Sequence, residues 1–254
     1  MIKKHLKRWS FLCIALAVFF AWGTGLASNR DLTVSMAFLP DILESPDKGV
    51  FADLVKAIDD VYDGNIKRKV YPMARSTDNV MTGKADFHLP MIRNKVVPVD
   101  SLPYAYTTEK MGDVVFVIYS HKDNPITYEK IQQAKNTKPF PIKVESIRGF
   151  ADYFDFPISE SSALDSSLRK VDMKRVDAFI FAQEESGFTL KQLKLKNVHR
   201  DKYDSFDDVF VIPKGAKGKE IDEILSQCIV KLRDSGKLQK LHRKVHLPYQ
   251  GWQP

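Results

Sequence analysis

The sequence predicts an α/β protein with two similar lobes, each built on a mostly parallel sheet flanked by helices. Strand and helix patterns alternate along the chain, which is typical of parallel sheets with helices on their faces. Residues 112–120 are too apolar for a one-sided strand and predict a strand buried on both faces. Residues 80–89 and 171–180 share one order: each ends a helix, turns through basic residues and enters a strand at Asp86 or Asp177. We interpret these two stretches as equivalent elements of the two lobes.

Residues 1–27 predict a secretory signal peptide. Four basic residues precede an unbroken apolar run over residues 11–22: Lys3, Lys4, Lys7 and Arg8. The run is 12 residues long, whereas a helix that spans a bilayer needs roughly 17 to 25. Small residues at Gly25 and Ala27 suit cleavage before Ser28, and the alternative is an uncleaved membrane anchor. We therefore expect a periplasmic protein.

Charge and cysteine content narrow the class of partner. The formal net charge is +7, but without residues 1–27 there are 35 Lys and Arg against 32 Asp and Glu, a net charge of +3. These charges are interspersed, which argues against a nucleic-acid partner. Only Cys228 remains outside the predicted signal, so we expect no internal disulfide, and the hydrophobic core alone must hold the fold.

The first half of the chain predicts strand–helix–strand units. Predicted strands cover residues 32–38, 66–71, 85–89 and 112–120, and predicted helices cover residues 50–62 and 74–82. Residues 40–49 are rich in Pro, Asp, Ser and Gly and predict a loop. The first helix repeats apolar residues at three-four spacing and stops at Asp63 and Gly64, and the second stops at Gly83.

The second half repeats this style and ends in helices. Predicted elements are a helix over 127–135, a strand over 141–146, a loop and helix near Gly149, a helix over 162–173, and strands over 176–181 and 208–213. Apolar residues from 221 to 232 then mark a long amphipathic helix closed by Gly236, followed by a short basic helix and a tail. No linker is long or Gly/Ser-rich enough to make the lobes independent, so they must share closely spaced crossings.

Several short motifs occur in an order that resembles a known family. They are residues 49–58 (GVFADLVKAI), 71–75 (YPMAR), 83–86 (GKAD), the Pro103-Tyr104 pair, and residues 175–178 (RVDA), 211–215 (VIPKG) and 232–236 (LRDSG). Their joint order and spacing are similar to those of the extracellular solute-binding proteins, family 3, of polar amino-acid ABC transporters. The resemblance covers nearly all of the chain after the predicted signal.

The resemblance implies the type II periplasmic binding protein fold, with a ligand cleft between the lobes. Two strand crossings are then expected, near Ile118-Tyr119 and near Phe210-Val211. Lobe 1 would comprise residues 28–117 and 211–254, and lobe 2 residues 118–210. The ligand would contact both lobes only in the closed state and would shift the population toward that state. The family also implies that a transporter recognises the closed state, so we expect an ABC transporter permease, or a membrane sensor, as the partner. We further expect a monomer without a cofactor or metal.

Two arginines of lobe 1 are candidate ligand contacts. Arg75 opens a short helix after a strand end, where a guanidinium can reach a cleft, and the alternative is a solvated helix residue. Arg93 follows another strand end. In the family the corresponding loop carries the Arg that pairs with the ligand carboxylate through two parallel hydrogen bonds, so we favour Arg93.

The remaining candidates are aromatic, apolar and polar side chains beside the expected cleft. Tyr104 and Tyr106 can stack on a ligand or cap it, and the alternative is core packing. Met91 can line the pocket or fill the core. From lobe 2 the candidate polar contacts are Arg148, Gln183 and Glu184.

The sequence departs from the family at the positions that recognise an α-amino acid. The Arg usually lies several residues beyond a Thr-rich segment, but the loop here is shorter. The lobe-2 Gly is usually followed by Ser or Thr, but Gly149 is followed by Phe150. The Asp that receives the ligand's amino group is replaced by Ala182. We therefore expect a small polar solute with a carboxylate rather than an ordinary α-amino acid.

Other titratable residues predict structural roles. His242 and His246 have metal-ligand spacing, but no third ligand is recognisable, and we expect a solvated basic helix face. His88 lies among apolar strand residues and predicts a core histidine, and Cys228 predicts a buried helix position. No nucleophile elbow, phosphate loop or zinc pattern occurs in the sequence.

Three functions remain open after these observations. The favoured hypothesis is a periplasmic binding protein that delivers a solute to an ABC importer and is not an enzyme. The second is a soluble sensor that partners a membrane signalling receptor. The third is a dehydratase-like enzyme that uses a cleft carboxylate, for which only Glu184 and Glu185 fall near a suitable strand end.

Overall fold

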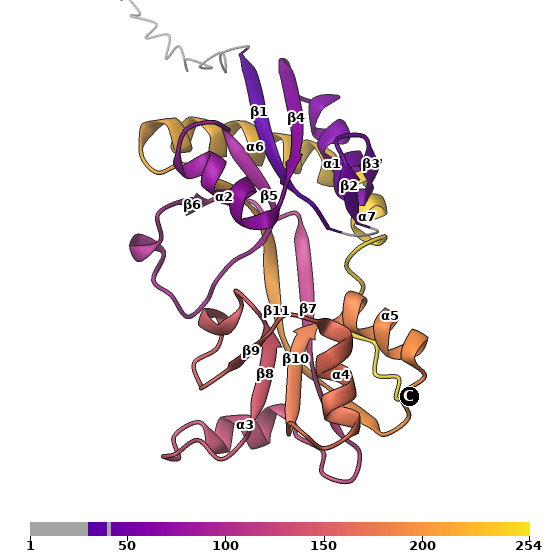
Figure 1. Cartoon of the computed structure of the whole chain (residues 1–254). Coiled ribbons are helices and arrows are strands. Elements are labelled where there is room, and N and C mark those ends of the chain that lie inside the picture. The colour runs from indigo at the N-terminus through magenta and orange to yellow at the C-terminus, as the bar shows by residue number, and fades with distance from the viewer. Residues whose placement is uncertain (1–29, 40–41) are drawn as a thin grey trace, which may run out of the picture.

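The computed structural model describes residues 30–39 and 42–254 (Figure 1). The predicted signal peptide, residues 1–27, lies outside this part of the chain. Within the described residues, no helix combines the length and apolar character needed to cross a membrane.

Two long strands join the two lobes. Strands β7 (Gly112–His121) and β11 (Val198–Ile212) pair antiparallel along the whole of β7 and lie in the middle of one nine-stranded sheet. The strand order of this sheet is β4-β1-β5-β11-β7-β10-β8-β9, with β6 paired to β11. Figure 1 shows one lobe at each end of β7 and β11. The predicted two-lobed α/β architecture is therefore confirmed.

Lobe 1 has a parallel set of strands covered by helices. The strands are β1 (Asp31–Ala37), β4 (Asn65–Tyr71) and β5 (Phe87–Ile92), and the helices are α1 (Val50–Asp59), α2 (Met73–Met81), α6 (Ala216–Asp234) and α7 (Lys237–His242). The lobe also contains η1 (Val99–Ser101) and β6 (Ala105–Tyr106). The predicted loop over residues 40–49 includes a small hairpin of β2 (Leu43–Ser45) and β3 (Lys48–Gly49). Apolar faces of α1 and α6 bury against β1 and β5 in one core.

Lobe 2 repeats this plan on the other side of the connecting strands. Its strands are β8 (Val144–Ile147), β9 (Ser159–Ser161) and β10 (Ala178–Ala182), and its helices are α3 (Tyr128–Ala134), α4 (Leu164–Asp172) and α5 (Gln183–Leu193), with η2 (Ala151–Tyr153). Helix α5 is absent from the sequence prediction. Its buried residues are Gln183, Ser186, Gly187 and Leu190, so it lacks the apolar repeat that marks a packed helix.

The two stretches predicted to be equivalent do have the same local structure. Asp86 accepts a hydrogen bond from the backbone N–H of Thr33 at 2.7 Å, and Asp177 accepts one from the N–H of Lys143 at 2.7 Å. The backbone N–H of each Asp also donates to the carbonyl of that same partner. The Asp in each lobe thus fixes the start of one strand against the start of a neighbouring strand.

The strand register shows that the carboxyl ends of both parallel sets point toward the junction of the lobes. Strand β5 is antiparallel to β11, and its last residue, Ile92, lies opposite Asp208 on the lobe-2 side of the pairing. Strand β10 is antiparallel to β7, and its last residue, Ala182, lies opposite Phe116 on the lobe-1 side. The loop that follows β5 and the first turn of α5, which follows β10, therefore each lie on the side of their lobe that faces the other lobe.

Sheet partners change near the predicted crossings. Strand β7 pairs with β10 from Phe116 onward, and β11 pairs with β5 from Asp208 onward. Each change lies slightly before the positions expected from the resemblance, near residues 118 and 210. The assignment of residues to lobes stays a prediction. Residues 198–207 also belong to β11, although their many polar side chains gave no strand pattern.

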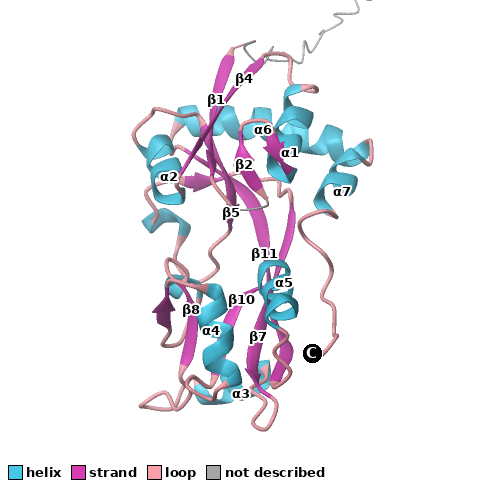
Figure 2. Cartoon of the chain, turned by 45° about the vertical axis from the view of Figure 1, so that its right-hand side comes forward, coloured by secondary structure: helices cyan, strands magenta, loops and turns pink. Residues whose placement is uncertain are grey.

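The C-terminal tail returns from lobe 1 to lobe 2. After α7 the chain leaves lobe 1 and runs along one side of the molecule onto lobe 2, where it ends (Figures 1 and 2). Tyr249 and Trp252 pack against a lobe-2 core cluster that includes Tyr119, Leu168 and Phe179. The tail is therefore part of the packed structure of lobe 2.

Candidate functional site

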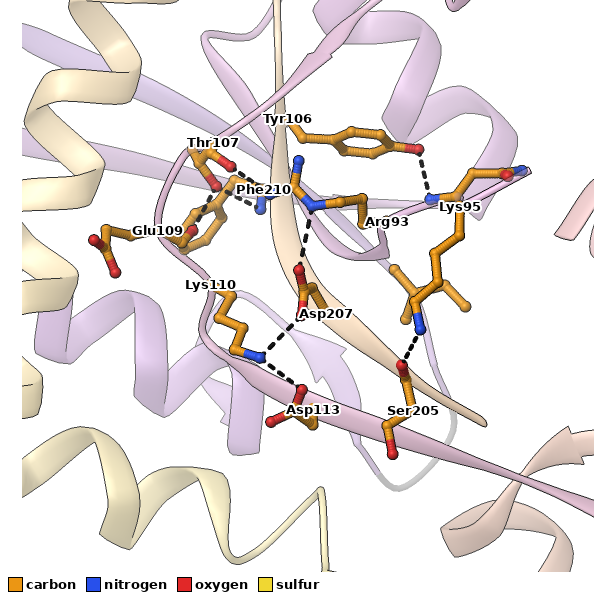
Figure 3. Close-up of polar contacts among 12 residues, drawn as sticks. Arg93, Lys95, Tyr106, Thr107, Glu109, Lys110, Asp113, Ser205, Asp207 and Phe210 are labelled. Atoms are coloured by element: carbon orange, nitrogen blue, oxygen red, sulfur yellow. Dashed lines mark hydrogen bonds and ion pairs between the residues drawn. The ribbon is translucent and has the colours of Figure 1, made fainter. Parts of the chain in front are cut away.

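Arg93 lies at the junction of the lobes, directly after β5. Its Nη2 donates to the carbonyl of Thr107 at 2.9 Å, and its Nε lies 3.4 Å from a carboxylate oxygen of Asp207 (Figure 3). The guanidinium carbon lies 5.4 Å from the ring centre of Tyr106. The side chain is 29% exposed. These contacts orient the guanidinium and leave part of it open to solvent.

A chain of alternating charges continues from Arg93 across the connecting strands. Lys110 Nζ lies 2.9 Å from Asp207 and 2.8 Å from Asp113. Burial opposes the negative charge of Asp207, but the hydrogen bond from Lys110 and the charges of Lys110 and Arg93 outweigh it, so the pKa of this carboxyl lies below its usual range. Hydrogen bonds to Asp113 and Asp207 raise the pKa of Lys110. Asp207 and Lys110 therefore stay ionised at neutral pH.

Two tyrosine rings form an aromatic wall beside Arg93. The rings of Tyr104 and Tyr106 meet edge to face with centroids 5.5 Å apart. The hydroxyl oxygen of Tyr106 accepts a hydrogen bond from the backbone N–H of Asn94 at 3.3 Å. Burial, together with the neighbouring Tyr106, raises the pKa of Tyr104. The Tyr104 hydroxyl therefore stays neutral at physiological pH.

Lobe 2 reaches this wall through η2. The hydroxyl of Tyr153 donates to the carbonyl of Ile92 at 3.0 Å and lies 3.6 Å from the sulfur of Met91. The side-chain amide of Asn94 donates to the carbonyl of Asp152 at 3.0 Å. These contacts join the lobes at the edge where β5 ends.

We expect Tyr153→Phe to lower the free energy of unfolding by about 0.5 to 1.5 kcal/mol, because the substitution removes the buried hydroxyl that donates to the carbonyl of Ile92. Thermal unfolding measures the effect. Tyr203→Phe is the matched control, since the Tyr203 ring packs in the same core cluster and its hydroxyl makes no hydrogen bond within the described residues. Equal effects of the two substitutions would contradict a special role for the bond to Ile92.

The other two candidate arginines are exposed and unpaired. Arg75 lies on the first turn of α2 and Arg148 directly follows β8. Neither side chain makes a hydrogen bond or ion pair with the part of the chain that the structure describes. Gly149, next to Arg148, has a φ of 90°, which favours glycine, and its N–H donates to Glu160. Each lobe thus presents one free guanidinium beside a strand end.

Gln183 and Glu184 bind the C-terminal tail. The side chain of Gln183 accepts a hydrogen bond from Gln250 N–H at 2.7 Å and donates to the carbonyl of Pro248 at 3.2 Å. A carboxylate oxygen of Glu184 accepts from Leu247 N–H at 2.8 Å. These side chains therefore hold part of their own chain, and sequence reasoning gave no sign of it.

The structure brings four of the predicted site residues together: Met91, Arg93, Tyr104 and Tyr106. Sequence reasoning missed Asp207, Thr107 and Tyr153, which orient or contact them. One signal for Asp207 was available. The pair Asp207-Asp208 stands at the start of the predicted strand over residues 208–213, where an acidic pair is unusual unless it has partners.

The two C-terminal histidines are not on a solvated face, so that prediction is wrong. His246 Nε2 lies 3.0 Å from Asp208, and the His242 ring packs so closely on Gly112 that an added Cβ there would clash with it. Burial opposes charge on His246, but the hydrogen bond to Asp208 outweighs it and raises the pKa of His246. Burial lowers the pKa of His242 to about 4. Among the described residues, no group of three or more His, Cys, Asp or Glu could hold a metal.

The predictions for His88 and Cys228 are confirmed. His88 is fully buried, with its Nδ1 2.7 Å from the hydroxyl oxygen of Ser76. Cys228 lies in the lobe-1 core, on the buried face of α6. Both residues therefore belong to the packing of lobe 1.

Comparison with solved structures establishes the fold. No family model matches the chain, and no curated protein sequence matches it. A histidine kinase sensor domain with similarity to periplasmic binding proteins matches with a TM-score of 0.61 and 14% identity over 84% of this chain and 95% of that one. The GluR0 ligand-binding core from Nostoc punctiforme, in complex with L-glutamate, matches at 0.60 and 13% over 84% and 98%.

A third match is a probable amino-acid ABC transporter extracellular-binding protein from Bacillus subtilis. It has a TM-score of 0.59 and 15% identity over 84% of this chain and 96% of that one. The chain thus has the two-lobed periplasmic binding protein fold, as its sequence motifs implied.

Proposed function

We propose that this chain is a periplasmic solute-binding protein that captures a small, polar, carboxylate-bearing solute between its lobes and delivers it to an ABC importer. The observation that carries the proposal is the opposition of strand ends. The carboxyl ends of β5 and β10 face each other across the two connecting strands, with Arg93 at the junction. In α/β proteins, ligands bind outside the carboxyl ends of the strands.

The charges around the junction favour an anionic ligand. Arg93 is oriented by Thr107 and Asp207 and is still partly exposed. Arg75 and Arg148 add a free guanidinium from each lobe. Guanidinium groups bind carboxylates through charge-assisted hydrogen bonds, often two at once. A ligand held from both sides would stabilise the closed arrangement of the lobes.

A ligand screen by thermal shift, followed by isothermal titration, tests the proposal. The expected result is a rise in melting temperature with a carboxylate-bearing solute, because a ligand at 100 times its Kd stabilises the folded state by about 2.7 kcal/mol. Absence of binding across amino acids, oligopeptides and organic acids would overturn it.

We expect Arg93→Ala to weaken binding of that ligand by roughly 10- to 150-fold, the equivalent of about 1.5 to 3 kcal/mol for a hydrogen bond to a charged group. Arg93→Lys should restore only part of the affinity, because an ammonium cannot present a planar two-point fork. The unliganded protein should also become less stable, since Thr107 and Asp207 lose a partner.

Arg169→Ala is the matched control for the Arg93 titrations. It removes a guanidinium from an exposed position of α4, and its affinity should equal that of the unmodified protein. If folded Arg93→Ala protein binds with full affinity, the anion site belongs to Arg75 or Arg148 instead.

A soluble sensor is the second candidate function. The likeness to a histidine kinase sensor domain favours it, since a sensor would use the same site between the lobes and differ in its partner. Adjacent permease and ATPase genes would support transport, and an adjacent gene for a membrane receptor would support sensing.

The proposal treats the protein as a binder without turnover. Two carboxyl groups could act as a general acid, which needs a raised pKa. Burial raises the pKa of Glu185. Glu184 instead holds the tail, because it accepts a hydrogen bond from the backbone N–H of Leu247. Bound ligand recovered unchanged after long incubation would support the proposal. Turnover that stops on Glu184→Gln would replace it with an enzyme.

A further inference from the structure

Residues 247–254, here called the strap, are anchored on lobe 2 by Arg200. This arginine is 1% exposed, and its Nη1 donates to the carbonyls of Gln250 at 3.0 Å and Trp252 at 2.6 Å. Its guanidinium carbon lies 3.9 Å from the ring centre of Trp252. The side-chain amide of Gln253 accepts from the N–H of Arg200 at 2.8 Å and donates to its carbonyl at 2.9 Å. The far end of the strap is thus built into lobe 2.

The near end of the strap is anchored on the first turn of α5. Leu247 and Gln250 donate their backbone N–H groups to Glu184 and Gln183. Gln183, which is 4% exposed, donates in return to the carbonyl of Pro248. Lobe 2 therefore holds the strap along its whole length.

The residues just before the strap are held by lobe 1 and by its end of β11. Val245 is 8% exposed in the lobe-1 core. His246 Nε2 lies 3.0 Å from Asp208, which is 1% exposed and pairs with Ile92 of β5. Consecutive residues, 246 and 247, are therefore fixed to different lobes. One residue of extended chain spans at most about 3.3 to 3.6 Å, so this connection has no slack.

The near end of the strap, at Leu247 and Pro248, stands apart from the two connecting strands, whereas its far end packs on β11 at Arg200. A cavity of about 830 Å³ lies between this near end and the strands, and its walls include Val115 of β7, Lys202 of β11, His242 of α7 and Pro248 of the strap. Figures 1 and 2 both show the strap running beside β7 and β11 as a separate connection. The connecting strands are hydrogen-bonded neighbours, so on their own they form one narrow joint.

We propose that the strap forms a third crossing between the lobes, anchored on lobe 2 by non-covalent contacts, which restrains their relative rotation through a pivot at residues 246–247. A joint of two paired strands permits bending and twisting, and each fixed point away from that joint opposes twisting. The contacts of Tyr153 with Ile92 and of Asn94 with Asp152 are one such point, and the strap adds another. The restraint does not depend on which ligand the protein binds.

Distances between spin labels on the two lobes test the proposal in the full chain. Both natural cysteines are replaced by Ala, and Cys is introduced at Met81 on lobe 1 and Met173 on lobe 2, which are 42% and 56% exposed. We expect removal of residues 247–254 to broaden the distance distribution of the unliganded protein. Trp252→Ala should broaden it less, because Gln183 and Glu184 still hold the near end.

Two matched variants separate the strap from general effects of substitution. Trp252→Phe keeps a ring over Arg200 and should retain a narrow distribution. Phe188 of α5 is 59% exposed, and its side chain makes no ring contact or hydrogen bond with the strap among the described residues. Phe188→Ala should therefore also retain a narrow distribution. Far-UV circular dichroism confirms folding. If the strap-deleted protein folds and its distance distribution is as narrow as that of the full chain, the proposal is overturned. If the deletion abolishes folding, an unchanged distribution width in Trp252→Ala overturns it.

Discussion

Arg200→Ala is expected to lower the free energy of unfolding by about 3 to 5 kcal/mol, because it combines a large-to-small change in a buried site with the loss of charge-assisted hydrogen bonds. The side chain is almost completely buried and donates to two carbonyls of the C-terminal tail. It also covers the face of Trp252, and the ring of Tyr119 lies 5.9 Å from its guanidinium carbon. Urea denaturation, followed by tryptophan fluorescence, measures the change.

Arg200→Lys separates hydrogen bonding from stacking. An ammonium can reach a carbonyl but cannot lie flat on an indole, so Lys should recover only part of the lost stability. Nε and Nη2 of Arg200 are buried and have no partner within the described residues, which partly offsets the favourable contacts of the native side chain. A loss below about 1 kcal/mol for Arg200→Ala would mean that this offset dominates.

The second large effect is a loss of folding stability at low pH, which originates at His88 in lobe 1. Burial lowers the pKa of His88 to about 4, from an ordinary value of 6.5. The folded state therefore holds the neutral ring, and its stability is fully present above pH 6.5 and is lost as the pH falls toward 4. Between about pH 7.5 and about pH 4.5 we expect this residue alone to remove about 2.5 kcal/mol.

His88→Asn isolates that contribution, because an amide can still face the Ser76 hydroxyl but cannot gain a proton. Burial also lowers the pKa of His242 to about 4, so His242 titrates in the same sense as His88 and contributes equally to both profiles. Three other groups titrate in the opposite sense. Burial raises the pKa values of Asp208 and Glu185. Burial opposes charge on His246, but the hydrogen bond to Asp208 outweighs it and raises the pKa of His246. Because these three groups bind protons more tightly in the folded state, they favour the folded state at lower pH. The informative quantity is therefore the difference in free energy of unfolding between the unmodified protein and His88→Asn at each pH. If the free energy of unfolding of the two proteins changes in parallel with pH, the acid sensitivity does not come from His88.

The elements that sequence analysis predicted correctly are those whose burial pattern is local. Helix α1 and strand β7 show their apolar periodicity within a few residues, and the structure confirms both. The similarity of the Asp86 and Asp177 stretches was also visible, because the same order of residues appears within ten positions in each. The structure gives its reason, since each carboxylate accepts a hydrogen bond from the backbone of a neighbouring strand or of the residue just before one. Helix α5 was missed because its buried face consists of small and polar residues.

The contacts that shape the site could not be predicted, because they join distant parts of the chain. Arg93 was identified from a family motif, but its partner Asp207 lies on another strand and is positioned only by the sheet. Glu184 looked like a ligand contact because it follows a strand end. The group that it binds, Leu247, comes 63 positions later, and no local pattern in the tail indicates such a return.

The return of the tail gives the chain ends a practical use. The first described residues lie in β1 of lobe 1, whereas Pro254 lies on lobe 2, although the last two helices belong to lobe 1 (Figure 1). A donor fluorophore at position 31 and an acceptor attached after Pro254 would therefore sit on opposite lobes. Their energy transfer would report lobe movement directly, so the protein could serve as a reporter for its own ligand without any label in the site.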